Sequence, residues 1–97
     1  MKSEISIKAA IYLRAAELVE IGHCKGRMTR RDGVACEFND ANQYCYHGAL
    51  RKAAFEYGLP DFDYKGGGEW PMAIWNDRPE RTGAEVAAKL RDRAFQG

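Results

Sequence analysis

The sequence Trp-Asn-Asp-Arg-Pro-Glu-Arg-Thr, residues 75–82, joins one predicted helix to the last one. Thr82 and Glu85 have the spacing of a capping box, in which the hydroxyl accepts from a first-turn amide and the carboxylate accepts from the amide of the capping residue. Asn76 and Asp77 suit the end of the preceding helix, because short polar side chains bond locally and tolerate a left-handed backbone. The stretch therefore predicts a fixed joint between two helices.

The sequence indicates where the two helices that flank this joint begin and end. Pro71 fits the first position of a short helix that continues to about Trp75, because the N–H that proline lacks would be unpaired there. The final helix is predicted from Gly83 to about Phe95. Its inner face, which repeats at the helical period, consists of Val86, Ala87, Leu90 and Ala94.

Another helix is predicted near the start of the chain, from a cap at Ser3 or Ser6 to about Ile21, with Gly22 as its stop. Acidic side chains fall on one side of this helix, so the other side is predicted to face the core. The apolar stripe consists of Ile7, Ile11, Tyr12, Ala15, Leu18 and Val19.

The pattern changes after this helix, and Asp32-Gly33 is a strong signal for a tight turn. It predicts a short β-hairpin with Met28 to Arg31 opposite Val34 to Glu37. A hairpin of two strands is marginally stable alone, so it is expected to lie against the helices.

Asp40 and Gln43 resemble a second capping box, which predicts a helix from there to about Tyr57. Gly58 and Pro60 then end this helix, because glycine suits the position after the cap and proline prevents continuation. The predicted core face consists of Tyr46, Ala49, Leu50, Ala53 and Tyr57.

These elements predict a single α+β domain over residues 1–97. It is mainly helical, with about four helices, one of them short, and one short β-hairpin around Asp32-Gly33. A Gly-rich loop from Asp61 to Gly68 connects the second helix to the short one. A chain of 97 residues with 45% hydrophobic side chains can build one small core.

The charge balance limits the partners that the whole molecule can attract. Fifteen basic and fourteen acidic side chains leave a formal net charge of +1, so no strong field gathers nucleic acid or anionic membrane. No apolar run approaches the roughly 20 residues that span a bilayer, so no membrane partner is predicted. The first residues lack the apolar core of a signal peptide, which predicts a cytoplasmic protein. Three cysteines then indicate reduced thiols rather than a disulfide framework.

The hairpin nevertheless carries a local positive cluster, which consists of Lys25, Arg27, Arg30 and Arg31. This cluster is the predicted partner-binding surface, because it suits an acidic protein surface or phosphates. Nucleic-acid binding through the same residues remains open but is not favoured. The alternative is that the four side chains form a solvated tip.

A second candidate site lies in the joint itself. An aromatic plate, an amide, a carboxylate and a guanidinium suit a nucleotide or a polar metabolite. The candidate ligand pocket consists of Trp75, Asn76, Asp77 and Arg81. The favoured alternative is that Asp77 and Arg81 form a charge-assisted pair that braces the turn around Pro79.

Thiol and imidazole groups give only a weak metal signal, because no C-x-x-C knuckle is present. The weak candidates are Cys24, Cys36, Cys45 and His47. Buried cysteines that act as small apolar side chains are favoured, so no metal and no cofactor are predicted. Cys45 and His47 lie two residues apart and would project about 200° apart on a helix. They do not suit a nucleophile with its base, and no catalytic residue is predicted.

Three segments together carry a resemblance to a known family. Residues 45–50 read C-x-x-G-A-L, residues 75–82 read W-N-D-x-P-x-R-T, and residues 13–20 read Leu-Arg-Ala-Ala-Glu-Leu-Val-Glu. Taken in chain order, these segments resemble a small bacterial and phage family, a domain of unknown function. The resemblance implies a shared fold and a phage or prophage origin, and it implies no activity.

The sequence favours a small binding protein without catalytic activity. It does not decide whether any catalysis occurs. In this interpretation a phage-encoded factor inhibits or modulates a host protein, for example of a defence system, through surface contacts. One alternative is a small-ligand or nucleotide-binding domain, with or without enzymatic activity, that uses Trp75 to Arg81. The other is nucleic-acid binding through the basic hairpin. The sequence indicates neither the identity of the partner nor the oligomeric state.

Overall fold

A computed structural model of the protein describes residues 6–26, 29–36, 40–59 and 71–95. Within these ranges the chain forms the α+β fold that the sequence predicts. No helix of the described ranges has the length and apolar character needed to pass through a bilayer. The predicted Gly-rich loop at 61–68 lies outside the described residues. In chain order the elements are α1 (Ile7–Ile21), β1 (Thr29–Arg31), β2 (Val34–Ala35), β3 (Gln43–Tyr44), α2 (Tyr46–Glu56), α3 (Pro71–Asn76) and α4 (Gly83–Ala94).

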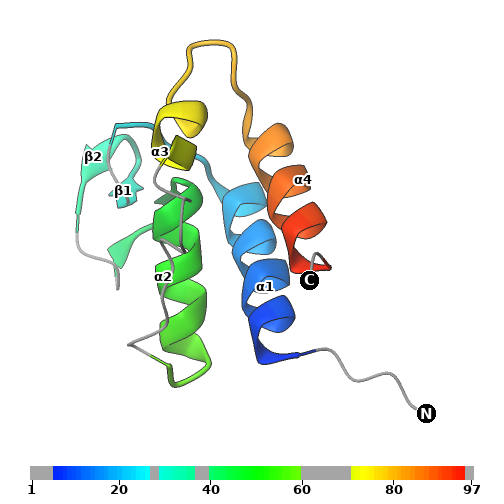
Figure 1. Ribbon diagram of the computed structural model, residues 1–97. Coiled ribbons are helices and arrows are strands. Elements are labelled where there is room, and N and C mark those ends of the chain that lie inside the picture. Colours follow the sequence, from blue (N-terminus) through cyan, green and yellow to red (C-terminus); the bar gives the residue numbers. More distant parts are fainter. Residues whose placement is uncertain (1–5, 27–28, 37–39, 60–70, 96–97) are drawn as a thin grey trace.

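The long helices lie side by side, with α1 between α2 and α4 and antiparallel to both (Figure 1). The small sheet contacts α1 and α2 through β3, and α3 packs on α2. Two surface ion pairs link the helices. Arg14 Nε lies 2.7 Å from Glu56 Oε1, and Arg91 Nη2 lies 2.6 Å from Glu20 Oε1. Exposed pairs of this kind add little stability, so the arrangement depends mainly on the core.

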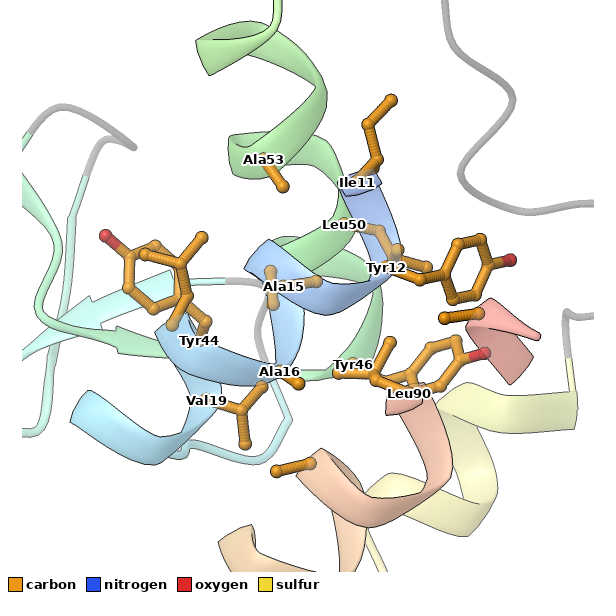
Figure 2. Packing of buried hydrophobic residues seen from close by; sticks show 14 of the residues in the cluster. Ile11, Tyr12, Ala15, Ala16, Val19, Tyr44, Tyr46, Leu50, Ala53 and Leu90 are labelled. Carbon is orange, nitrogen blue, oxygen red and sulfur yellow. The ribbon is translucent and has the colours of Figure 1, made fainter. Parts of the chain in front are cut away.

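Side chains from α1, α2 and α4 meet in one core (Figure 2). The largest fully buried apolar side chains are Tyr46, Ile11, Leu50, Leu90, Val19 and Val86. Alanines fill much of the remaining interface and let the helices approach closely, namely Ala9, Ala15, Ala16, Ala49, Ala53, Ala54, Ala87 and Ala94. The predicted inner faces are confirmed except for Ile7 and Tyr57, which lie at helix ends and are exposed.

Helix α1 has the predicted limits. The sequence predicts Gly22 as a helix-ending glycine, but the structure requires glycine there for a different reason. The Ser6 hydroxyl accepts the Ala9 N–H at 3.1 Å and caps the start of the helix. Gly22 has an extended backbone with φ −171°, not the left-handed backbone of a helix-ending glycine. A Cβ at Gly22 would overlap the carbonyl oxygen of Asn42. Glycine is therefore needed because another segment of the chain packs directly on its Cα.

The predicted hairpin turn is confirmed. Asp32 and Gly33 have φ angles of 52° and 86°. Two consecutive residues with positive φ match the type I′ turn, whose twist suits a two-residue hairpin. Strand β1 pairs with β2 in the antiparallel sense, with Arg31 opposite Val34. The outer ends of the two predicted strands lie outside the described residues.

Strand β3 is an element that the sequence analysis missed. Gln43 and Tyr44, predicted as helical, pair with β1 instead and make β1 the middle strand of the sheet. The predicted capping box is wrong, because the Gln43 side chain accepts the Gly33 N–H at 2.6 Å rather than capping a helix at Asp40. Helix α2 begins after Cys45, whose sulfur accepts an N–H from the first turn at 3.3 Å.

The end of α2 has the predicted chemistry. Gly58 adopts the left-handed backbone with φ 73°. Its N–H donates to the Phe55 carbonyl at 3.0 Å, and the Leu59 N–H donates to the Ala54 carbonyl at 2.8 Å. These two bonds form a Schellman motif, which satisfies the last carbonyls of the helix.

The close approach at Gly22 gives a direct test of this fold. We expect Gly22→Ala to lower the free energy of unfolding by about 3 kcal/mol, because the new methyl group must displace the Asn42 backbone. The control is Gly58→Ala, where the added Cβ meets no atom of the described residues within 4 Å apart from the adjoining ones, and the strain comes from positive φ. That variant should lose about 1 kcal/mol. Equal losses in urea denaturation would show that packing against Asn42 is not what requires glycine.

Candidate functional site

The side chain of Asn76 lies at the end of α3 and is 0% exposed. Its Oδ1 accepts the Tyr46 N–H at 3.1 Å and lies 2.8 Å from His23 Nε2. Its Nδ2 donates to the Cys24 carbonyl at 3.1 Å and to Asp77 Oδ1 at 2.9 Å. A carboxamide can accept two hydrogen bonds and donate two, so its capacity is fully used.

These partners also fix the orientation of the amide and show which nitrogen of the neighbouring imidazole carries a hydrogen. The Tyr46 backbone N–H can only donate, so the atom that faces it must be the oxygen of Asn76. His23 Nε2 contacts the same oxygen and must therefore carry a hydrogen. The imidazole thus acts as a donor within the interior of the joint.

Asn76 extends a pairing between two other segments of the chain. His23 and Tyr44 form a parallel bridge, in which the Tyr44 N–H donates to the Gly22 carbonyl at 2.9 Å and the Cys24 N–H donates to the Tyr44 carbonyl at 3.2 Å. If the parallel pairing continued, the next backbone hydrogen bond would run from the N–H of residue 46 to the carbonyl of residue 24. The Asn76 amide occupies that position and connects the two backbones.

The turn after Asn76 is fastened to the segment that follows α1. Asp77 Oδ1 accepts the Gly26 N–H at 3.0 Å. The Lys25 ammonium donates to the carbonyls of Arg78 and Pro79, at 2.6 and 3.2 Å. Together with Asn76, these contacts join residues 24–26 to residues 76–79 through several independent bonds.

Arg81 binds the other side of the same turn. Its Nε donates to the Trp75 carbonyl at 3.1 Å, and its guanidinium carbon lies 4.1 Å from the centre of the indole ring. Nη1 lies 3.5 Å from Glu85 Oε2. The ammonium of Lys89 lies 5.6 Å from the same indole centre. Trp75 is partly buried against the core, and these cations hold its ring by cation–π attraction.

The predicted capping box at the start of α4 is confirmed. Thr82 Oγ1 accepts the Glu85 N–H at 3.1 Å, and Glu85 Oε1 accepts the Thr82 N–H at 2.9 Å. The bond from the Thr82 backbone N–H is the main cause that lowers the pKa of the Glu85 carboxyl. The charged carboxylate also suits the positive end of the helix dipole.

The predicted pocket residues are neighbours, but they do not present a shared set of free polar groups. Asn76 is enclosed and has no unused hydrogen-bonding capacity. Asp77 and Arg81 bind different partners, so the predicted ion pair between them is wrong. Ligand binding at Trp75–Arg81 stays a prediction, and it could use only the outer part of this stretch.

The described members of the basic cluster bind backbone carbonyls as well as facing solvent. Arg30 donates to the carbonyls of Gly33 at 3.0 Å and Lys25 at 3.3 Å. Arg31, which is exposed, donates to the Asp40 carbonyl at 2.9 Å. Arg27 lies outside the described residues. These bonds hold the hairpin in shape, and binding of a partner by the cluster stays a prediction.

The candidate metal ligands are buried, except for Cys36, which is partly buried. Cys24 and Cys45 are buried, Cys36 is partly buried, and the His47 ring is buried with its edge against Tyr46. Burial is the main cause that raises the pKa of the Cys24 thiol to about 12, and burial also raises the pKa of Cys45. Among the described residues, no three His, Cys, Asp or Glu side chains are grouped to hold a metal ion.

Comparison with known proteins adds no further information on this joint. No protein-family model matches the chain, and neither the curated proteins nor the solved structures gave a match. The resemblance to the bacterial and phage family of unknown function stays a prediction. The sequence analysis missed the contacts of Asn76 with His23 and Tyr46, since no local spacing rule connects residues so far apart in the chain.

The buried amide predicts a large effect of one substitution. We expect Asn76→Ala to lower the free energy of unfolding by about 4 kcal/mol, because it removes the acceptor of the Tyr46 N–H and the donor to the Cys24 carbonyl in a buried site. Asp77→Ala is the matched control, because it removes the exposed bond from the Gly26 N–H and one bond of Asn76. It leaves the bonds of Asn76 to Tyr46 and Cys24, so it should cost about 1 kcal/mol. Chemical denaturation of both variants measures the difference. A cost for Asn76→Ala no larger than that of the control would contradict the role of the amide.

The raised pKa of Cys24 predicts how stability depends on pH. Below the ordinary thiol pKa of 9.0 both folded and unfolded chains keep the proton. Between there and about 12 the unfolded thiol ionises while the folded one does not, so the free energy of unfolding falls as pH rises. The contribution of Cys24 approaches about 1.4 kcal/mol per pH unit. Urea denaturation from neutral to alkaline pH should show a shallower fall for Cys24→Ala, and an unchanged slope would be evidence against this cause.

Proposed function

We propose that this domain is a non-catalytic binding protein that recognises an apolar surface on a partner protein. The supporting observation is a set of large apolar residues, 40 to 71% exposed, in the first turn of α1 and at or just after the ends of α2 and α4. These three helix termini point toward the same end of the molecule (Figure 1). We call this set the apolar end. It consists of Ile7, Phe55, Tyr57, Leu59 and Phe95.

Their common place at the helix termini, rather than the exposure of any one residue, supports the proposal. Single exposed apolar side chains are normal on soluble proteins, whereas neighbouring ones mark interaction surfaces. The other large exposed apolar side chains of the described residues, Ile21, Val34 and Ile74, belong to three different elements away from this end. Three members of the apolar end are aromatic, and aromatic side chains contribute much of the binding energy at protein interfaces.

The apolar end is also partly ordered before a partner binds. The Schellman bonds of Gly58 and Leu59 fix the backbone that carries Tyr57. The Arg51 guanidinium carbon lies 6.0 Å from the centre of the Phe55 ring, where cation–π attraction favours one ring orientation. A surface that is ordered in advance loses less conformational entropy on binding.

The partner class that we propose is a host protein bound by a phage-encoded factor. The family resemblance supports this class, because the resembling family is bacterial and phage-derived. The basic hairpin is the competing surface, and it predicts an acidic protein or nucleic acid instead of an apolar protein surface. Arg31 tests that alternative best, because it is exposed and its described contact is a hydrogen bond to the Asp40 carbonyl.

The proposal predicts which surface substitutions abolish binding. We expect the triple variant Phe55→Ser, Tyr57→Ser and Phe95→Ser to lose at least about tenfold in affinity for the partner, since it removes three exposed apolar anchors. The matched control is Ile21→Ser, Val34→Ser and Ile74→Ser, which removes apolar side chains elsewhere that are 65 to 69% exposed. Affinity capture from host lysate, with partners identified by mass spectrometry, compares both variants with the unsubstituted chain.

The other outcomes assign the surface differently. Equal capture by both triple variants would contradict the apolar end as the binding surface. Loss of capture by Arg31→Glu alone would assign binding to the hairpin, and capture of nucleic acid would replace the protein partner. Light scattering after size exclusion separates a second copy of the chain from a different partner.

A further inference from the structure

Cys24 and Cys45 occupy matching positions on two paired segments. Each follows a residue of the parallel bridge, Cys24 after His23 and Cys45 after Tyr44. The Cys24 N–H donates to the Tyr44 carbonyl at 3.2 Å, so the pairing reaches the first cysteine. Paired strands lie about 5 Å apart, and side chains in register point to the same face. This spacing lies within the range of Cα distances that a disulfide spans, about 4.4 to 6.8 Å.

Two further observations support the closeness of the two thiols. Both side chains are buried where the segment after α1 meets the start of α2, and we call this place the junction. Cys24 is 6% and Cys45 is 8% exposed. After burial, the neighbouring Cys45 thiol is the next largest cause that raises the pKa of Cys24, and Cys36 contributes least of the groups around it. The remaining charged neighbours of Cys24 are Arg30 and Asp77.

The backbone at both cysteines is held from outside the pair. The Cys24 carbonyl accepts from Asn76 Nδ2 at 3.1 Å. Cys45 is the cap of α2, and its sulfur accepts the Gly48 N–H at 3.3 Å. A sulfur atom in a disulfide can still accept this weak bond. The junction is therefore ordered before any bond forms between the sulfur atoms.

We propose that Cys24 and Cys45 form a reversible intramolecular disulfide when the chain meets a low-molecular-weight disulfide such as oxidised glutathione. One cysteine thiolate attacks a sulfur of the oxidant, forming a mixed disulfide and releasing the first small thiol. The second cysteine thiolate attacks the protein sulfur of the mixed disulfide and releases the second small thiol. The two protein thiols lose two electrons, the oxidant gains them, and both protons end on the released thiols.

This bond would connect the same two segments that Asn76 joins by hydrogen bonds. It closes a loop of about 20 residues, which restricts the unfolded chain and stabilises the fold. The raised pKa of both thiols keeps thiolate scarce at neutral pH, so the reaction is slow and depends on local opening. The inference is independent of the proposed binding function, because no residue of the apolar end takes part.

The experiment equilibrates the full chain in glutathione buffers of increasing oxidised fraction, then traps free thiols by alkylation and maps peptides by mass spectrometry. We expect the chain to lose the mass of two hydrogen atoms, with Cys24 linked to Cys45 and only Cys36 alkylated. Cys36→Ser should still form the bond, whereas Cys45→Ser should not. Serine is a good helix cap, so the second variant is expected to remain folded. Oxidation should raise Tm by about 10 °C.

The remaining outcomes overturn the inference. A link from Cys24 to Cys36, a glutathione adduct as the only product, or no oxidation in the most oxidising buffer would each show that the pair is not placed for a disulfide. A Cys24–Cys45 bond that forms only in denaturant, or that lowers Tm, would show that the native junction does not accommodate it.

Discussion

The Asn76 carboxamide is the interaction on which the junction of this fold depends. It takes the place of one backbone bond between the segment after α1 and the start of α2, and it does so from the end of α3. Because the amide is fully enclosed, its loss would remove the acceptor of the buried Tyr46 N–H and the donor to the Cys24 carbonyl, and lost hydrogen bonds in a buried site cost free energy. Three segments far apart in sequence therefore reach a common geometry through one side chain.

The parts of the fold that the sequence predicted correctly have local causes. The turn at Asp32-Gly33, the cap at Thr82 and the glycine ending at Gly58 each depend on residues within a few positions. Strand β3 could not be predicted in this way, because its residues pair with β1 and the Gln43 side chain binds the hairpin turn. The capping pattern at Asp40 and Gln43 indicated a helix, but Gln43 instead lies in a strand because β3 pairs with β1, which lies earlier in the chain.

The same distinction applies to the candidate site. The sequence predicts a candidate ligand pocket within residues 75–81, and the structure explains most of its polar groups by internal contacts. Asn76 holds the junction, Asp77 binds Gly26, and Arg81 packs on Trp75. The apolar end could not be recognised from sequence, because its members come from the ends of three helices whose approach is set by the core.

The most direct test of the central claim is a scalar coupling measured across the hydrogen bond from the Tyr46 amide nitrogen to the Asn76 side-chain carbonyl carbon by NMR. The structure predicts a detectable coupling and strong protection of the Tyr46 amide from hydrogen exchange, because this N–H is buried and bonded at 3.1 Å. A missing coupling together with rapid exchange of the Tyr46 amide would contradict the claim that Asn76 joins the three segments.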